Sequence, residues 1–156
     1  MEYIEIIVAA LCATSTMTLF SYLISESFRK LYKEPLLMQF LMTSFDLDLS
    51  ARQKVVASWV IHYLIGLLFV ACYYLPIWLE CAWYTISIAS GLWFGCIIGG
   101  IGIAGWTVMF KLSPANPPVD PKGYYLQLFV AHIIFGLTVA AVHLSFMHYV
   151  TAALSK

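Results

Sequence analysis

The chain has 156 residues, of which 62% are hydrophobic and only 10% are charged. A soluble domain has about 25% charged residues, so a water-soluble core of this size could not bury so much apolar surface. The formal net charge of zero also argues against the basic surface that nucleic-acid binding requires. We therefore expect a single integral membrane domain over residues 1–156, with the lipid bilayer as partner and no nucleic acid.

Four stretches are long and apolar enough to cross a membrane, since a helical span needs about 20 mostly apolar residues. They cover approximately residues 4–25, 55–79, 82–112 and 124–154. The strands of a membrane β-barrel would be about 10 residues long and alternating, whereas these runs are continuous. Because lipid cannot satisfy backbone polar groups, the pattern predicts an all-α membrane protein with four transmembrane helices in a bundle.

The connection between the first two spans contains an amphipathic segment at about residues 35–45. Four of its apolar side chains share one helical face: Leu36, Leu37, Phe40 and Leu41. This pattern predicts a helix that lies on the inner membrane surface or folds back under the bundle. A capping box, with Ser50 followed three residues later by Gln53, marks the start of the next helix.

The basic residues predict the orientation in the membrane. Seven of them lie in the connections after the first and third spans, namely Arg29, Lys30, Lys33, Arg52, Lys54, Lys111 and Lys122, and only Lys156 lies on the opposite side. Because cytoplasmic loops are enriched in Lys and Arg, both connections should be cytoplasmic. We expect a multi-pass protein of the bacterial inner (plasma) membrane, N-out and C-out.

The third span carries a stripe of glycines. Gly91, Gly95, Gly99 and Gly102 are spaced by four, four and three residues, so they line one helical face. Small residues let membrane helices approach closely, so this face should form a helix–helix contact. The sequence leaves open whether the stripe meets the first span or a second copy of the protein, and a contact inside the chain is favoured.

Two phrases in the second and fourth spans are nearly the same. They are WVIHYLIGLLFVA, from Trp59, and FVAHIIFGLTVAA, from Phe129, with five identities in thirteen positions. Among the identities are a histidine, His62 or His132, and a glycine four residues later, Gly66 or Gly136. The match suggests a duplicated two-helix unit, a parallel repeat of a kind known in transporters. A chance match between apolar stretches is the alternative.

The two histidines should lie at the same depth, since both helices run from the inside outward and place them about 10–12 Å into the membrane. A histidine inside a bilayer is costly and usually faces the protein interior or a wet cavity. Three interpretations stay open: a structural pair bonded to the threonine-rich first span or a water, a polar ligand or proton site, or the axial ligands of a b-type haem. Gly66 and Gly136, one turn further along, would clear space for a helix or a flat ring.

Two further residues extend this candidate ligand site. His143 lies three turns beyond His132 on the same face, and Tyr73 occupies the equivalent place in the second span. Because that place holds no histidine, at most one haem is expected, with His62 and His132 as its iron ligands. Two histidines are too few for zinc, and no catalytic set of nucleophile, base and acid is apparent, so an enzyme is disfavoured.

The small, threonine-rich first span AALCATSTMTLFSYL, the glycine-rich third span and the two H-x-x-x-G phrases resemble those of small four-helix bacterial inner-membrane proteins, of the YagU-like kind and of kinds common in Bacteroidota. The resemblance covers most of the chain and implies a fold and a compartment, but no activity.

The sequence thus favours a small, non-enzymatic binding or accessory protein with the histidine pair at its centre. It would need no cofactor and would act in a larger membrane complex or as a homodimer. One alternative is an electron-transfer protein with a single b-type haem or a quinone site. A second alternative is a transporter of small solutes or protons that acts as a dimer.

Overall fold

The computed structural model describes residues 2–154, which form five α-helices and no strand. The helices are α1 (Glu2–Phe28), α2 (Glu34–Ser44), α3 (Ala51–Trp78), α4 (Ile88–Leu112) and α5 (Pro121–Leu154). All except α2 are long and apolar enough to cross a membrane. The expectation of an all-helical, multi-pass membrane protein is therefore confirmed. Lys156, the one basic residue expected on the outer side, lies outside the described residues.

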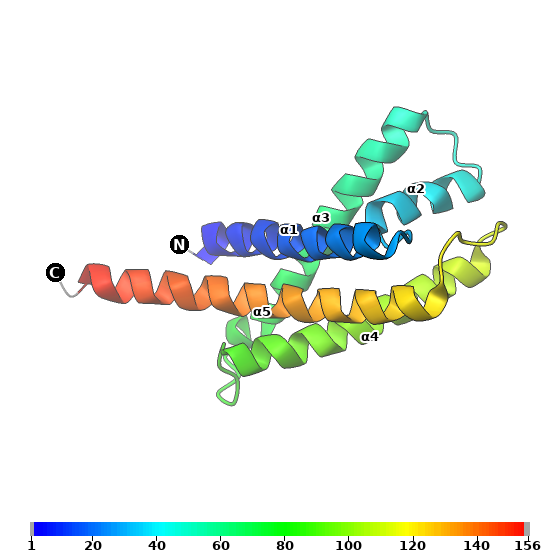
Figure 1. Ribbon diagram of the computed structural model, residues 1–156. Coiled ribbons are helices and arrows are strands. Elements are labelled where there is room, and N and C mark those ends of the chain that lie inside the picture. Colours follow the sequence, from blue (N-terminus) through cyan, green and yellow to red (C-terminus); the bar gives the residue numbers. More distant parts are fainter. Residues whose placement is uncertain (1, 155–156) are drawn as a thin grey trace.

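Helix α5 lies between α1 and α4 and contacts both along much of its length (Figure 1). Helix α3 crosses α1 obliquely, and its first half leans away from α4 and contacts α2. The ends of the chain lie at one end of the molecule, and the connections on either side of α2 and between α4 and α5 lie at the other (Figure 1). As a result α3 and α5 run in the same direction.

Local capping decides where the helices begin. The predicted capping box is present, because the Ser50 side chain accepts from the backbone N–H of Gln53 and the Gln53 side chain accepts from Ser50. Helix α4 begins at Ile88, six residues later than expected, because Ser87 and Ser90 form a second capping box there. The prediction that the third span begins at residue 82 is therefore wrong by six residues.

Helix α2 folds back under the other helices, which was one of its two expected placements. Leu37 and Leu41 are buried in one cluster with Trp106 of α4 and Tyr124 and Leu128 of α5. Leu36, expected on the same apolar face, is exposed instead. The buried face of α2 instead includes its first residue, Glu34, together with Leu37 and Leu41.

The glycine stripe of α4 forms a contact inside the chain, as favoured from the sequence, but its partner is α5 and not the first span. A Cβ placed on Gly95 would lie 2.7 Å from the carbonyl oxygen of His132. A Cβ on Gly136 would overlap the carbonyl oxygen of Gly91. The two backbones therefore approach so closely that neither helix has room for a side chain at these positions.

We expect Gly95→Ala to destabilise the protein by about 1–3 kcal/mol, because the new methyl group must push apart two packed backbones. Gly100→Ala is the matched control on the same helix, where a Cβ would meet nothing within 4 Å. It should leave stability unchanged or raise it slightly, because alanine favours helix more than glycine does. Thermal unfolding of the detergent-purified variants measures both, and equal melting temperatures would contradict the close α4–α5 contact.

Candidate functional site

His62 and His132 line one cavity of about 200 Å³, to which all five helices contribute. The walls are mostly apolar, with a few polar groups among them. The residues that define its shape are Thr14 and Met17 of α1, Glu34 of α2, His62 and Phe69 of α3, Gly102 and Trp106 of α4, and His132 of α5. An apolar cavity with a few convergent polar groups is the usual form of a small-molecule site.

The hydrogen bonds of His62 define which ring nitrogen carries its proton. Its Nε2 lies 2.8 Å from the hydroxyl oxygen of Thr18. That hydroxyl already donates its single hydrogen to the carbonyl of Thr14, at 2.6 Å, so it can only accept from the histidine. In the neutral ring, Nε2 is therefore the donor and Nδ1 is left as an acceptor.

His132 is fixed in the opposite sense. Its Nδ1 lies 2.8 Å from the carbonyl oxygen of Leu128, which can only accept, so the neutral ring keeps Nε2 as an acceptor. The edge of the ring packs on Gly102 of α4, where a Cβ would lie 3.0 Å from Cε1 and 3.2 Å from Nε2. Gly102 thus leaves room for the imidazole beside the cavity.

A buried carboxyl group, Glu34, completes the polar part of the wall, although the sequence analysis did not identify it. Only 4% of the residue is exposed. Its Oε1 accepts from the Ser21 hydroxyl at 3.0 Å, and that hydroxyl accepts from Nε2 of Gln127 at 2.6 Å. Oε2 has no hydrogen-bond partner among the residues that the structure describes.

Burial raises the pKa of Glu34 to about 7, from an ordinary value of 4.5. The hydrogen bond from Ser21, together with the nearby backbone N–H of Glu34 and the amide of Gln127, favours the charged form but does not outweigh desolvation. Removing a carboxylate from water without a counter-charge is costly, and such a group commonly takes up a proton. Near pH 7 both protonation states of Glu34 are accessible.

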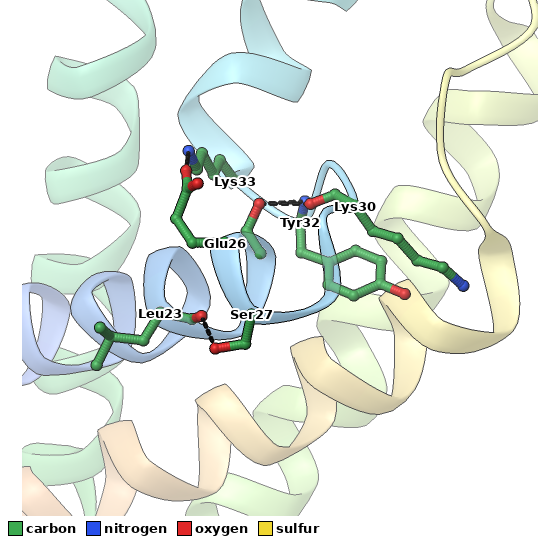
Figure 2. Close-up of polar contacts among 7 residues, drawn as sticks. Leu23, Glu26, Ser27, Lys30, Tyr32 and Lys33 are labelled. Carbon is green, nitrogen blue, oxygen red and sulfur yellow. Dashed lines mark hydrogen bonds and ion pairs between the residues drawn. The ribbon is translucent and has the colours of Figure 1, made fainter.

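The turn between α1 and α2 holds Glu34 in place and keeps basic side chains away from it. Figure 2 shows the Lys33 ammonium directed at Glu26, with which it forms an ion pair. The carbonyl oxygen of Lys30 accepts from Ser25, and its ammonium pairs with Asp120 at 2.7 Å. Within residues 2–154, Glu34 itself takes part in no ion pair.

A signal for Glu34 was present in the sequence. Glu34, Leu37 and Leu41 are spaced as i, i+3 and i+7, which places them on one helical face. The amphipathic segment predicted from the sequence contains both leucines but begins at residue 35, and so leaves Glu34 out. Extending the apolar face by one turn toward the N-terminus would have placed this carboxyl against the other helices.

The other candidate residues are divided between the cavity and the rest of the protein. Gly66 lines the cavity, and its Cα faces the Thr14 side chain so closely that a Cβ would overlap the hydroxyl. Gly136 faces Gly91 and Gly95 of α4. The hydroxyl of Tyr73 lies 2.8 Å from the Ser90 hydroxyl, near the start of α4.

His143 belongs to a second polar cluster, at the end of the molecule where the chain begins and ends. Oε1 of the buried Glu5 lies 2.6 Å from the Tyr74 hydroxyl and 2.6 Å from Nδ1 of His143. These contacts join α1, α3 and α5. His143 therefore does not share the cavity of His132, although both lie on α5.

Three of the residues that line the cavity are exposed, namely Ile65 of α3 and Ile101 and Gly105 of α4. We infer from their exposure that the cavity has a mouth between α3 and α4. These residues lie within the apolar length of helices that can cross a membrane. In a bilayer such a mouth faces lipid rather than water, so a lipid-soluble molecule could enter.

The chain matches no protein-family model, no curated protein and no solved structure. Among residues 2–154, no three His, Cys, Asp or Glu side chains are grouped so that they could hold a metal ion. The chemistry of the cavity is therefore the basis for a functional argument.

We expect Glu34→Gln to stabilise the protein at pH 8 and to have its smallest effect at pH 5. Because the folded-state pKa of Glu34 is raised, the stability that its neutral form provides is complete below pH 4.5 and is lost as the pH rises through about 7. The loss amounts to at most about 3 kcal/mol at pH 8, and glutamine cannot ionise. Thermal unfolding of both proteins across this pH range measures the difference.

Glu80→Gln provides the control for this experiment, since Glu80 is exposed in the connection between α3 and α4. It should leave the pH dependence of the melting temperature unchanged. A Glu34→Gln protein with the pH dependence of the wild type would show that the pKa of Glu34 is the same in the folded and unfolded states, which would contradict the raised value.

Proposed function

We propose that this protein is a small, non-enzymatic membrane protein that binds the ring of one lipid-soluble molecule. The observation that supports this most strongly is the pair formed by His62 and His132. Each ring has one N–H engaged by the protein, and both rings lie on the wall of one cavity. Two imidazole nitrogens are thus left to accept hydrogen bonds from a ligand.

The size of the cavity favours a single ring. An engineered apolar cavity of about 150 Å³ in another protein binds benzene, so about 200 Å³ accommodates one ring with one or two small substituents. Phe69, Trp106 and Phe135 give the wall an aromatic character. A hydrocarbon tail on the ring could extend through the mouth between α3 and α4 into the lipid.

The histidines favour a ligand that carries a hydroxyl group. A site built to accept a hydrogen bond discriminates strongly against an analogue without the donor, because its buried polar groups are then left unpaired. Phenols and quinols combine one apolar ring with such a hydroxyl. A lipid-soluble phenol or quinol is therefore the ligand class that this cavity suits best.

Haem binding is a second candidate, favoured by one observation. Metal-ligating histidines usually donate their other ring N–H to a carbonyl or carboxylate, and His132 donates Nδ1–H to Leu128 in this way. His62, however, engages Nε2 with Thr18 and would have to release it or use Nδ1. A single ring also fits the cavity volume better than a haem macrocycle does.

We expect the protein purified from cells supplied with a haem precursor to show no Soret absorption band. A Soret band that disappears in both His62→Ala and His132→Ala would replace the present proposal with the electron-transfer alternative. His148→Ala is the matched control, because this exposed histidine lies near the far end of α5 and should not affect the spectrum.

Two features support the proposed topology, a four-helix bundle built from a parallel repeat. Gly66 of α3 packs against Thr14 of α1, and Gly136 of α5 packs against Gly91 of α4. The proposed halves are α1 with α3, and α4 with α5. In each half the repeated glycine of the second helix contacts the first helix. This is the relationship that duplication of a two-helix unit would produce.

The charge distribution supports a location in a bacterial inner membrane with both ends of the chain outside. Both basic connections lie at the same end of the molecule (Figure 1), as the enrichment of Lys and Arg in cytoplasmic loops requires. Glu34 and the cavity would then be nearer the cytoplasmic side. An accessory role in a larger complex and transport by a dimer both stay predictions.

We expect para-cresol to bind to the protein in lipid nanodiscs about tenfold more tightly than toluene, which has the same ring and methyl group but no hydroxyl. His132→Leu should abolish this preference, while the exposed control His148→Leu should keep it. Ligand-observed NMR, with empty nanodiscs as the blank, measures the affinities. Equal binding of the two probes to the wild type would contradict the proposal.

A further inference from the structure

We propose that protonated Glu34 is a third binding group of this cavity and donates a hydrogen bond to an oxygen atom of the ligand. The ligand would then be a ring with two oxygen substituents, one donating to a histidine and the other accepting from Glu34, and its binding would require a proton. This inference rests on the proposed function, since it concerns the same cavity and the same ligand.

The unpartnered oxygen of Glu34 is the structural basis for the proposal. The residue lines the cavity and is almost completely buried. Ser21 occupies Oε1, while Oε2 is a buried polar atom without a hydrogen-bond partner in the described part of the chain. An unpaired buried group of this kind is expensive, and a ligand oxygen would satisfy it.

The protonation state decides what Glu34 can do for a ligand. A carboxylate only accepts hydrogen bonds, whereas a protonated carboxyl donates one. No basic side chain in the described part of the chain is paired with Glu34, so a proton is the simplest counter-charge for it. With a pKa of about 7, the group gains or loses this proton within the physiological range.

Titratable side chains from several helices surround Glu34. Tyr22 of α1 and Tyr124 of α5 interact electrostatically with it, and His62 of α3 and His132 of α5 share its cavity. Lys33 precedes it but is paired with Glu26, and the residues of α4 that line the cavity do not titrate. Among these groups the histidines are the side-chain type whose ordinary pKa lies nearest to neutral pH, so a histidine variant serves as a control.

One other unpartnered polar atom lies beside the cavity, the hydroxyl oxygen of Thr14. This hydroxyl could also donate to a ligand oxygen, but it does not titrate near neutral pH. A pH-dependent affinity therefore distinguishes Glu34 from Thr14 as the donor.

The test measures the affinity of para-methoxyphenol for the full-length protein in nanodiscs between pH 6 and pH 9. This probe has one hydroxyl donor and a second oxygen that can only accept. If only the form with protonated Glu34 binds, the affinity should fall about a hundredfold over this range, since the protonated fraction falls tenfold per pH unit above the pKa. In Glu34→Gln, whose amide donates at every pH, the affinity should change less than threefold.

Control probes and variants separate the possible outcomes. Para-cresol lacks the second oxygen and should bind with little pH dependence, and His62→Gln should retain the steep pH dependence of para-methoxyphenol. Binding of para-methoxyphenol that is independent of pH in the wild type, or equally dependent in Glu34→Gln, would overturn this inference while leaving the proposed function intact. Absence of any preference for para-cresol over toluene would instead overturn the proposed function.

A spectroscopic measurement addresses Glu34 directly. The infrared carbonyl band of a protonated carboxyl group, assigned as the band lost in Glu34→Gln, should shift to lower frequency when para-methoxyphenol is added at pH 6. An unshifted band in a protein that binds the probe would also overturn the inference.

Discussion

The close approach of α4 and α5 is the constraint on which the cavity depends. Gly95 and Gly136 let the two backbones touch, which brings His132 against α4. Gly102 then leaves room for the imidazole ring, and the carbonyl of Leu128 fixes its orientation. Because lipid provides no hydrophobic force between membrane helices, such contact between small residues is a main source of their association. It also holds one wall of the cavity rigid.

Helix α2 provides the second essential element, since it carries a carboxyl group into the space between the long helices. The apolar contacts of Leu37 and Leu41 with α4 and α5 offset the cost of burying Glu34. Ser21, whose hydroxyl accepts from Gln127, supplies part of its hydrogen bonding. Glu34 Oε2 still has no hydrogen-bond partner among the described residues, so stability alone does not explain why this carboxyl group is buried here. Buried polar groups that the protein itself leaves unsatisfied are frequent at sites of function.

Several features could be predicted from the sequence because they depend on neighbouring residues alone. Hydrophobic runs predicted the four long helices, and the Ser50–Gln53 pair predicted the start of α3. The repeated phrase singled out His62 and His132, and both line one cavity, while their role as a binding pair stays a prediction. The same reasoning added His143, three turns beyond His132, to the candidate ligand site, but the structure places it with Glu5 and Tyr74. Eleven residues of helix separate the two histidines by about 16 Å, which is too far for one small site.

The sequence by itself determined which residues are helical and which faces of the helices are small, apolar or polar, because helical periodicity is a local property. Only the tertiary structure decided which faces meet. The glycine stripe packs on α5 rather than α1, and α2 places Glu34 beside the histidines, because these contacts depend on crossing angles and on the path of the connections. Neither quantity can be read from the spacing of residues within one helix, and the chemistry of the cavity depends on both.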